Sequence, residues 1–145
     1  MSRIGSEEIA ILREMVGLEL LSVEYEASGD VESAYLRFRD GFVELAAILC
    51  PEALSDAFPW RLAPRLCDLH AAPTDLAPRI LDLGRVASVH LHEDGSKARV
   101  ECLLAIELEG RPALWVWAAG GDFVQTSLSG PPDYATDYPL ARTVQ

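Results

Sequence analysis

The 145-residue sequence has little basic charge. Lysine and arginine together number 12 against 23 aspartates and glutamates, which gives a formal net charge of −11 at pH 7. Affinity for a nucleic-acid backbone depends on clustered basic residues, so we expect no DNA or RNA partner. The acids are concentrated early in the chain, because residues 1–50 hold ten acids and four bases. A basic protein surface is the kind of partner that this charge favours.

Long apolar runs are also missing. The opening MSRIGSEEIAILREM has acids inside its first apolar stretch, which is unlike a signal peptide, and no run in the chain is long enough to span a membrane. The sequence therefore predicts a cytoplasmic protein without membrane contact.

Cysteine is scarce, and the common cofactor motifs do not occur. Cys50, Cys67 and Cys102 are odd in number and show no CxxC spacing, so they indicate neither a disulfide framework nor a zinc ribbon. We interpret them as free thiols, and the sequence leaves a Cys50–Cys67 disulfide open. There is no phosphate loop, no HExxH and no GxSxG. We expect no cofactor and no metal.

What the sequence does contain is typical of one globular domain over residues 1–145. Half of its residues are apolar and 24% are charged, which is far from the composition of disordered chains. A chain of this length buries about two thirds of its unfolded surface, which suffices for one core.

The segment YLRFRDGFVEL, residues 35–45, fits either a helix or a hairpin. Its apolar residues recur at helical spacing, but Asp40-Gly41 interrupts that stripe and the flanking residues alternate between apolar and polar. A glycine inside a helix costs about 1 kcal/mol relative to alanine, whereas Asp-Gly suits a tight turn. We therefore predict strands near 18–27, 33–39 and 42–49, with an Asp40-Gly41 hairpin. Before them, Ser6 is predicted to cap a short helix with the apolar stripe Ile9, Leu12 and Met15 or Val16.

The second half predicts an antiparallel meander. Residues 84–130 alternate and are interrupted by turn pairs at Asp94-Gly95, Glu109-Gly110 and Gly120-Gly121. A two-residue turn at Asp94-Gly95 sets the register, with the pairs Leu91–Ala98, Val89–Val100 and Ala87–Cys102. The same face continues through Leu104, Ile106, Trp115 and Trp117. The tryptophans are therefore expected to be core residues rather than a ligand platform.

Between these regions lies a proline-rich segment, residues 50–84. Five prolines exclude one long helix and allow short ones, which we place after Ser55 and after Thr74. The predicted fold class is α+β: mostly antiparallel β meanders, an N-terminal helix, and short helices of the central segment covering the sheet. The C-terminal tail, PPDYATDYPLARTVQ, is predicted to lie as a strap across the sheet rather than to form a tyrosine-rich contact patch.

Two groups of residue types suggest chemistry. His90 and His92 share one face of a predicted strand and are spaced as two ligands of one metal would be. The predicted register sets them opposite Arg99 and Lys97, which disfavours a cation. Cys67, Asp68 and His70 combine a thiol, an acid and a base, but adjacency in sequence is weak evidence for catalysis. We predict no catalytic residues.

Two functional hypotheses remain. The first is a non-catalytic, acidic protein-interaction module, similar to immunity proteins or secretion chaperones in size and charge only, that binds a basic protein surface through Glu19, Glu24, Glu26 and Glu32. The second is a small-molecule binder or enzyme whose pocket lies between the curved sheet and the central segment. Its polar groups would be Arg61, Arg65 and His70, in a segment that also contains Arg79 and Arg85.

Overall fold

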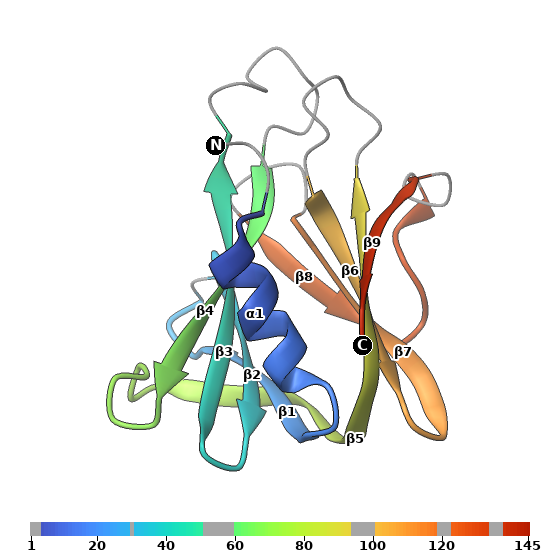
Figure 1. Ribbon diagram of the computed structural model, residues 1–145. Helices are drawn as coiled ribbons and strands as arrows, with labels where there is room; N and C mark the ends of the chain where they lie inside the picture. The colour runs from blue at the N-terminus through green and yellow to red at the C-terminus, as the bar shows by residue number, and fades with distance from the viewer. Residues whose placement is uncertain (1–3, 30, 51–59, 94–100, 119–122, 134–137) are drawn as a thin grey trace.

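The computed structural model describes residues 4–29, 31–50, 60–93, 101–118, 123–133 and 138–145 (Figure 1). One helix and nine strands make up these regions. Their bounds are α1 Ser6–Met15, β1 Glu19–Glu26, β2 Ser33–Phe38, β3 Gly41–Leu49, β4 Trp60–Asp68, β5 Leu76–Glu93, β6 Glu101–Leu108, β7 Arg111–Ala118, β8 Val124–Ser127 and β9 Leu140–Val144.

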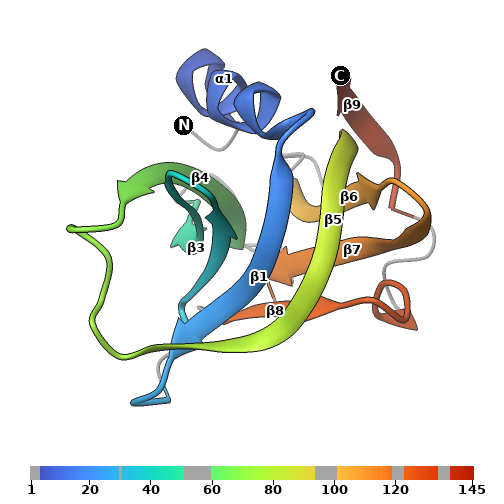
Figure 2. The ribbon, with the colours of Figure 1, turned by 90° about the horizontal axis from the view of Figure 1, so that it is seen from below.

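All strand pairs are antiparallel, in the order β4-β3-β2-β1-β5-β6-β7-β8, with β9 also paired to β5. The sheet curls so that its two ends face each other. Strand β4 contacts β6 and β7, and β8 contacts β2 and β3. Seen from below, β1 and β5 run side by side through the middle of this curl (Figure 2). The main apolar core lies between the two facing halves.

The long strand β5 belongs to both halves. Its first part, up to Arg85, pairs with β1, and its last part pairs with β6 on one edge and β9 on the other. The change comes near Asp82 and Gly84, which have φ of 56° and 107°. Glycine adopts this conformation without steric cost, so the strand can bend here and continue into the second half of the sheet.

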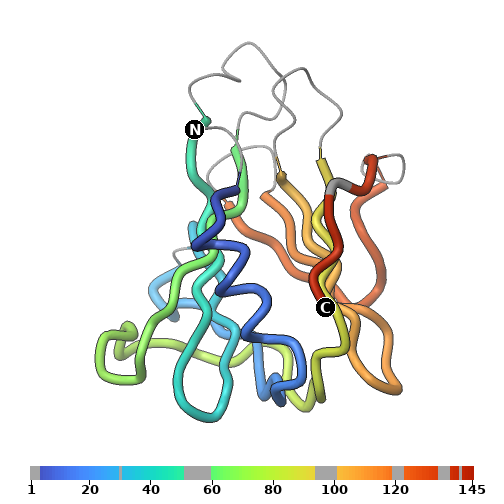
Figure 3. Tube along the Cα trace, in the orientation of Figure 1, coloured from blue at the N-terminus to red at the C-terminus, as the bar shows by residue number. Residues whose placement is uncertain are grey.

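Helix α1 is confirmed, with one difference at its start. It buries Ile9, Leu12 and Met15, as the spacing predicts, and it contacts β4, β5 and β9 (Figure 3). The residue before the helix, its N-cap, is Gly5 and not Ser6. Glycine has no side chain to cap the helix, so only the reciprocal contact of a capping box is made: the Gly5 N–H donates to the Glu8 carboxylate at 3.0 Å.

The hairpin at residues 35–45 is also confirmed, but its turn is shifted by one residue. Phe38 pairs with Gly41, so Arg39 and Asp40 are the turn residues. Gly41 is the first residue of β3 and its φ is not positive. A Cβ at this position would lie 3.1 Å from the carbonyl oxygen of Cys67 on β4. The glycine is therefore needed for close strand packing and not for turn conformation.

The predicted covering layer of short helices is wrong. Residues 60–68 and 76–93 form β4 and β5, and Thr74 and Asp75 lie in the turn before β5; the helix expected after Ser55 falls outside the described residues. Proline is compatible with strands at sheet edges and at bulges. Pro64 lies on the edge strand β4, and Pro78 lies at a register shift opposite Glu24. The prolines therefore exclude helix without excluding sheet.

The predicted register of the second half is wrong as well. Leu91 pairs with Leu104 and Val89 with Ile106, so Cys102 is not opposite Ala87, and the Asp94-Gly95 pair lies outside the described residues. His90 is opposite Ala105 and Thr143, not Arg99. His92 is opposite Leu103 and Leu140, so no cation stands directly opposite either histidine to disfavour a metal there.

The tryptophans lie on the opposite face from the one predicted. The main-core face of β7 is formed by Leu114, Val116 and Ala118. Trp115 and Trp117 are half-buried beside Cys50, Cys102 and Leu103 in a second apolar cluster. A register shift between Ile106 and Leu108 changes the alternation by one residue, which moves both rings to the other face. The described part of the tail does not cross the sheet as a strap: it joins the sheet as β9, which pairs with β5, and Tyr138 packs on this second cluster.

Candidate functional site

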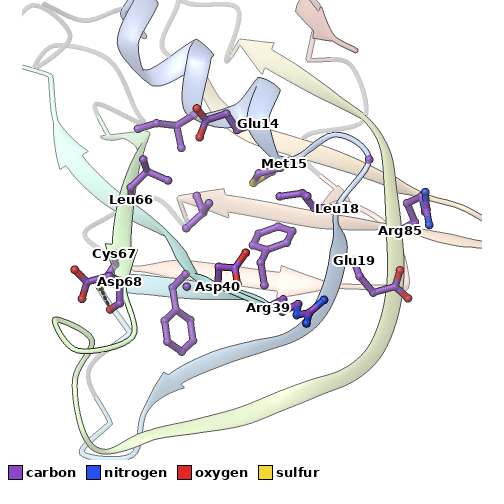
Figure 4. Close-up of a pocket in the computed structure, with 16 residues that line it drawn as sticks. Glu14, Met15, Leu18, Glu19, Arg39, Asp40, Leu66, Cys67, Asp68 and Arg85 are labelled. Carbon is purple, nitrogen blue, oxygen red and sulfur yellow. Dashed lines mark hydrogen bonds between the residues drawn. The ribbon is translucent and has the colours of Figure 1, made fainter.

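A groove of about 550 Å³ opens at one end of the core (Figure 4). Its walls are the C-terminal half of α1, the Gly17–Glu19 segment that leads into β1, the β2–β3 hairpin, the last residues of β4, and Arg85 of β5. These segments are separate in sequence and are brought together by the curl of the sheet. We call this site the hairpin groove.

The floor of the hairpin groove is apolar. It is lined by Ile11, Met15, Phe38, Phe42 and Val43, and Leu18 and Leu66 also line the groove. Leu18 and Leu66 are 48% and 62% exposed, although leucine is normally buried where a core is available. Together they place exposed apolar surface at the mouth of a concave site, which is typical of binding surfaces.

Six charged residues also line the hairpin groove. The acids are Glu14, Glu19, Asp40 and Asp68, and the bases are Arg39 and Arg85. In Figure 4 the Arg39 side chain extends toward Glu19. Arg85 approaches Glu109 at 3.8 Å, but both side chains are more than half exposed, so this pair contributes little. The four acids and two bases give the groove a net negative charge. The whole chain, with a net charge of −11, is also negative.

Cys67 lies in the hairpin groove but is poorly suited to act as a nucleophile. Burial raises the pKa of its thiol, and the negative charges of Glu44 and Asp68 raise it further. The Asp68 carboxylate accepts the backbone N–H groups of His70 and Ala71 at 3.0 and 2.7 Å. Cys67, Asp68 and His70 therefore form the end of a strand and a turn stabilised by Asp68. Burial and the nearby carboxylates favour the protonated thiol of Cys67, which is the unreactive form.

The structure does not bring the four predicted acids together. Glu19 lines the hairpin groove, Glu26 is half-buried and Glu32 is exposed. Glu24 is only 4% exposed; its carboxylate accepts the Ser22 hydroxyl at 2.7 Å. Burial of Glu24 removes it from the surface that a partner would contact.

The three polar residues of the small-molecule hypothesis are also apart. Both terminal nitrogens of Arg61 donate to the Glu8 carboxylate, at 2.9 and 3.1 Å, which attaches β4 to α1. Arg65 pairs with Glu44 at 3.1 Å, and His70 is exposed in the turn after β4. None of the three lines the hairpin groove. Arg61 and Arg65 instead have structural partners.

Glu44 is the centre of a polar cluster on the face of β2 and β3 that is turned away from the core. Besides Arg65, it accepts hydrogen bonds from the hydroxyls of Ser33 and Tyr35, at 2.6 and 3.3 Å. Burial and the Glu44 charge raise the pKa of Tyr35 above its ordinary range. The Tyr35 hydroxyl therefore stays protonated and acts as a donor to Glu44.

Ser88, His90 and Glu107 have the residue types of a hydrolytic triad without its geometry. Ser88 Oγ and Glu107 Oε1 both approach the same nitrogen, His90 Nε2, at 3.2 and 3.0 Å. A triad has its nucleophile and its acid on opposite ring nitrogens. Here the other nitrogen, Nδ1, faces Thr143 at 2.9 Å. The cluster therefore joins β5, β6 and β9 rather than activating a nucleophile.

Within the ranges that the structure describes, no group of three or more His, Cys, Asp or Glu side chains could hold a metal ion. No described helix is long and apolar enough to cross a membrane. None of the three cysteines forms a disulfide, so the Cys50–Cys67 bridge is absent.

Comparison of this chain with models of protein families, with curated proteins and with solved structures gave no match.

Proposed function

We propose that the protein is a non-catalytic interaction module whose hairpin groove binds an apolar anchor of a basic protein segment. The observation that carries this proposal is the exposure of Leu18 and Leu66 at the mouth of an apolar groove in a strongly acidic chain. Apolar side chains of a partner would contact the floor, and flanking Lys or Arg side chains would face the acids around it.

The charge distribution supports a basic partner over an acidic one. Glu14, Glu19 and Asp40 have no ion-pair partner within 4 Å among the residues that the structure describes. Their charges are therefore available to a partner without breaking an existing pair. The field of a chain with net charge −11 would in addition speed its association with a cationic surface and slow that with nucleic acid. A cytoplasmic location is part of the same proposal and agrees with three cysteines that form no disulfide.

Site-specific photocrosslinking in the native host tests the proposal. A photoreactive amino acid at Leu66 samples the groove, and the same substitution at Leu81 on β5 is the matched control. The two leucines are 62% and 59% exposed, but only Leu66 lines the groove.

We expect an adduct of protein mass at Leu66 and none at Leu81. The crosslinked segment, mapped by mass spectrometry, should contain an apolar residue flanked by Lys or Arg. The absence of a protein adduct at Leu66, an equal yield at Leu81, or a crosslinked segment that is acidic would each contradict the proposal.

A further inference from the structure

A second cavity, of about 560 Å³, lies at another edge of the core and shares no residue with the hairpin groove. Strands β1 and β5 form one wall, and β7 and the start of β8 form the other. Tyr25 joins the two walls, because its hydroxyl donates to the Val124 carbonyl at 2.9 Å and lies 3.3 Å from Thr126 Oγ1. The Val124 N–H also donates to the Val31 carbonyl at 2.7 Å. We call this site the Arg79 cavity.

Arg79 supplies the cation of the cavity. Its guanidinium carbon lies 4.4 Å from the centre of the Tyr25 ring, a cation–π contact that holds the side chain in place. No carboxylate lies within 4 Å of Arg79 in the described part of the chain, although acids outnumber bases almost two to one overall. Stacking on a ring uses the face of a guanidinium and leaves its N–H edge available for a bidentate contact with a carboxylate.

The remaining walls favour a flat, apolar ligand body. Trp117 and Phe123 are the large aromatic residues that line the cavity; Trp117 also packs on the second apolar cluster, and Phe123 is 49% exposed. Gln125 and Thr126 add polar groups beside them. Aromatic walls with a few polar groups, in a volume of several hundred Å³, are characteristic of small-molecule sites.

We propose that the Arg79 cavity binds a planar aromatic monocarboxylate. The carboxylate would pair with the N–H edge of Arg79, and the ring would pack against Trp117 and Phe123. A single arginine matches one negative charge, and the net charge of −11 opposes polyanions such as nucleotides. This site and its ligand are independent of the partner proposed for the hairpin groove.

Two isosteric probes test the proposal: 2-naphthoate, and the uncharged 2-naphthamide. Binding of each to the full chain is measured by NMR titration, which reports both affinity and location. We expect naphthoate to bind at least about tenfold more tightly than naphthamide, which corresponds to about 1.4 kcal/mol for the charged pair. The largest shifts should occur at Trp117, Phe123 and Thr126.

Four variants make the test specific. Arg79→Gln should remove the preference for naphthoate, and Arg79→Lys should retain part of it because the charge remains without the planar fork. Phe123→Ala should weaken both probes by a similar factor. Arg13→Gln, an exposed arginine on α1, is the control and should change neither affinity.

Several outcomes would overturn the proposal. These are equal affinity for the two probes, an unchanged preference in Arg79→Gln, no binding of naphthoate, or shifts confined to residues of the hairpin groove. Arg79 is exposed, so folding of the variants is expected and is checked by their spectra.

Discussion

The ion pair between Arg61 and Glu8 holds α1 against β4, and replacing Arg61 by methionine would remove it while keeping most of the side-chain volume. The Arg61 side chain is 9% exposed and makes two hydrogen bonds to Glu8 and one to the Leu62 carbonyl. Removing one partner of a buried pair costs about 3–5 kcal/mol. Two features lower this value here.

The first is that the Glu8 side chain is 22% exposed and also accepts the Gly5 N–H, so it would not be left unpaired. The second is that Arg61 Nε is buried without a hydrogen-bond partner, so its desolvation cost disappears with the guanidinium. We therefore expect Arg61→Met to lower the free energy of unfolding by about 2–3 kcal/mol. In a domain of this size the melting temperature falls by about 2–4 °C for each kcal/mol.

Urea unfolding of wild type, Arg61→Met, Glu8→Gln and the double variant measures this loss and the coupling between the two residues. Arg65→Met is the matched control, because Arg65 is on the same strand and also pairs with a glutamate, but is 63% exposed; its loss should stay below about 1 kcal/mol. A loss below about 1 kcal/mol for Arg61→Met, or a coupling energy near zero, would refute the reasoning. Helix α1 would then be held by its apolar stripe alone.

Three further predictions concern single sites. Gly41→Ala should destabilise the protein by about 1–2 kcal/mol in the same unfolding assay, because the added Cβ would lie 3.1 Å from a backbone oxygen of the neighbouring strand; a neutral result would mean that β4 can move away. Of the three cysteines, only Cys67 should react with a thiol reagent in the native state, because Cys50 and Cys102 are buried. At neutral pH Cys67 should react more slowly than a small thiol in solution, because its pKa is raised. Labelling of Cys50 or Cys102 as fast as Cys67 would contradict their place in the core. The pKa of Glu107 is lowered mainly by the hydrogen bond from Ser88 and, second, by the one from His90. These bonds should therefore stabilise the fold above the unfolded pKa of about 4.3, and this stabilisation should be lost as the pH falls through the lower folded pKa. Carbon NMR titration of Glu107 in Ser88→Ala should show its pKa move upward, and no change would contradict the role of that hydrogen bond.

Local signals in the sequence were sufficient for the first third of the fold. The helix follows from three apolar residues at helical spacing, and the hairpin from alternation around Asp40-Gly41. Both features involve residues close in sequence, where few arrangements compete. The conformation of Gly41 was nevertheless misread, because its close neighbour is on β4, more than 20 residues later in the chain.

The central segment and the late register depend on distant contacts. Proline excludes helix locally, but only the position of a strand in its sheet decides whether proline is tolerated there. Pro64 is tolerated because β4 is an edge strand, and no local pattern shows which strand will be at the edge. Similarly, the shift between Ile106 and Leu108 cannot be found from alternation, and it decides which face carries Trp115.

The hairpin groove was not predicted from the sequence. Its lining residues come from α1, the segment before β1, the β2–β3 hairpin, β4 and β5, and only Glu19 was among the predicted binding residues. The one signal in the sequence would have been leucines at positions where the alternation of the strand predicts a solvent-facing residue. Leu18 follows Gly17, whose φ is 90°, and therefore precedes the regular strand; Leu66 lies near the end of an edge strand. Such positions are recognisable only after the strands have been aligned.

The four arginines of the central segment show how a mistake in secondary structure becomes a mistake about the site. A helix rises 1.5 Å per residue and a strand about 3.3 Å, so Arg79 and Arg85 are separated by about 20 Å along β5 rather than about 9 Å. The extended chain places Arg79 in its cavity and Arg85 at the hairpin groove, while Arg61 and Arg65 pair with glutamates. Because the two sites share no lining residue, Arg85→Gln should change crosslinking at the groove without changing the affinity for naphthoate, and Arg79→Gln should do the reverse. A variant that altered both readouts would mean that β5 moves as one body between the sites, and the two proposals would then describe one coupled site.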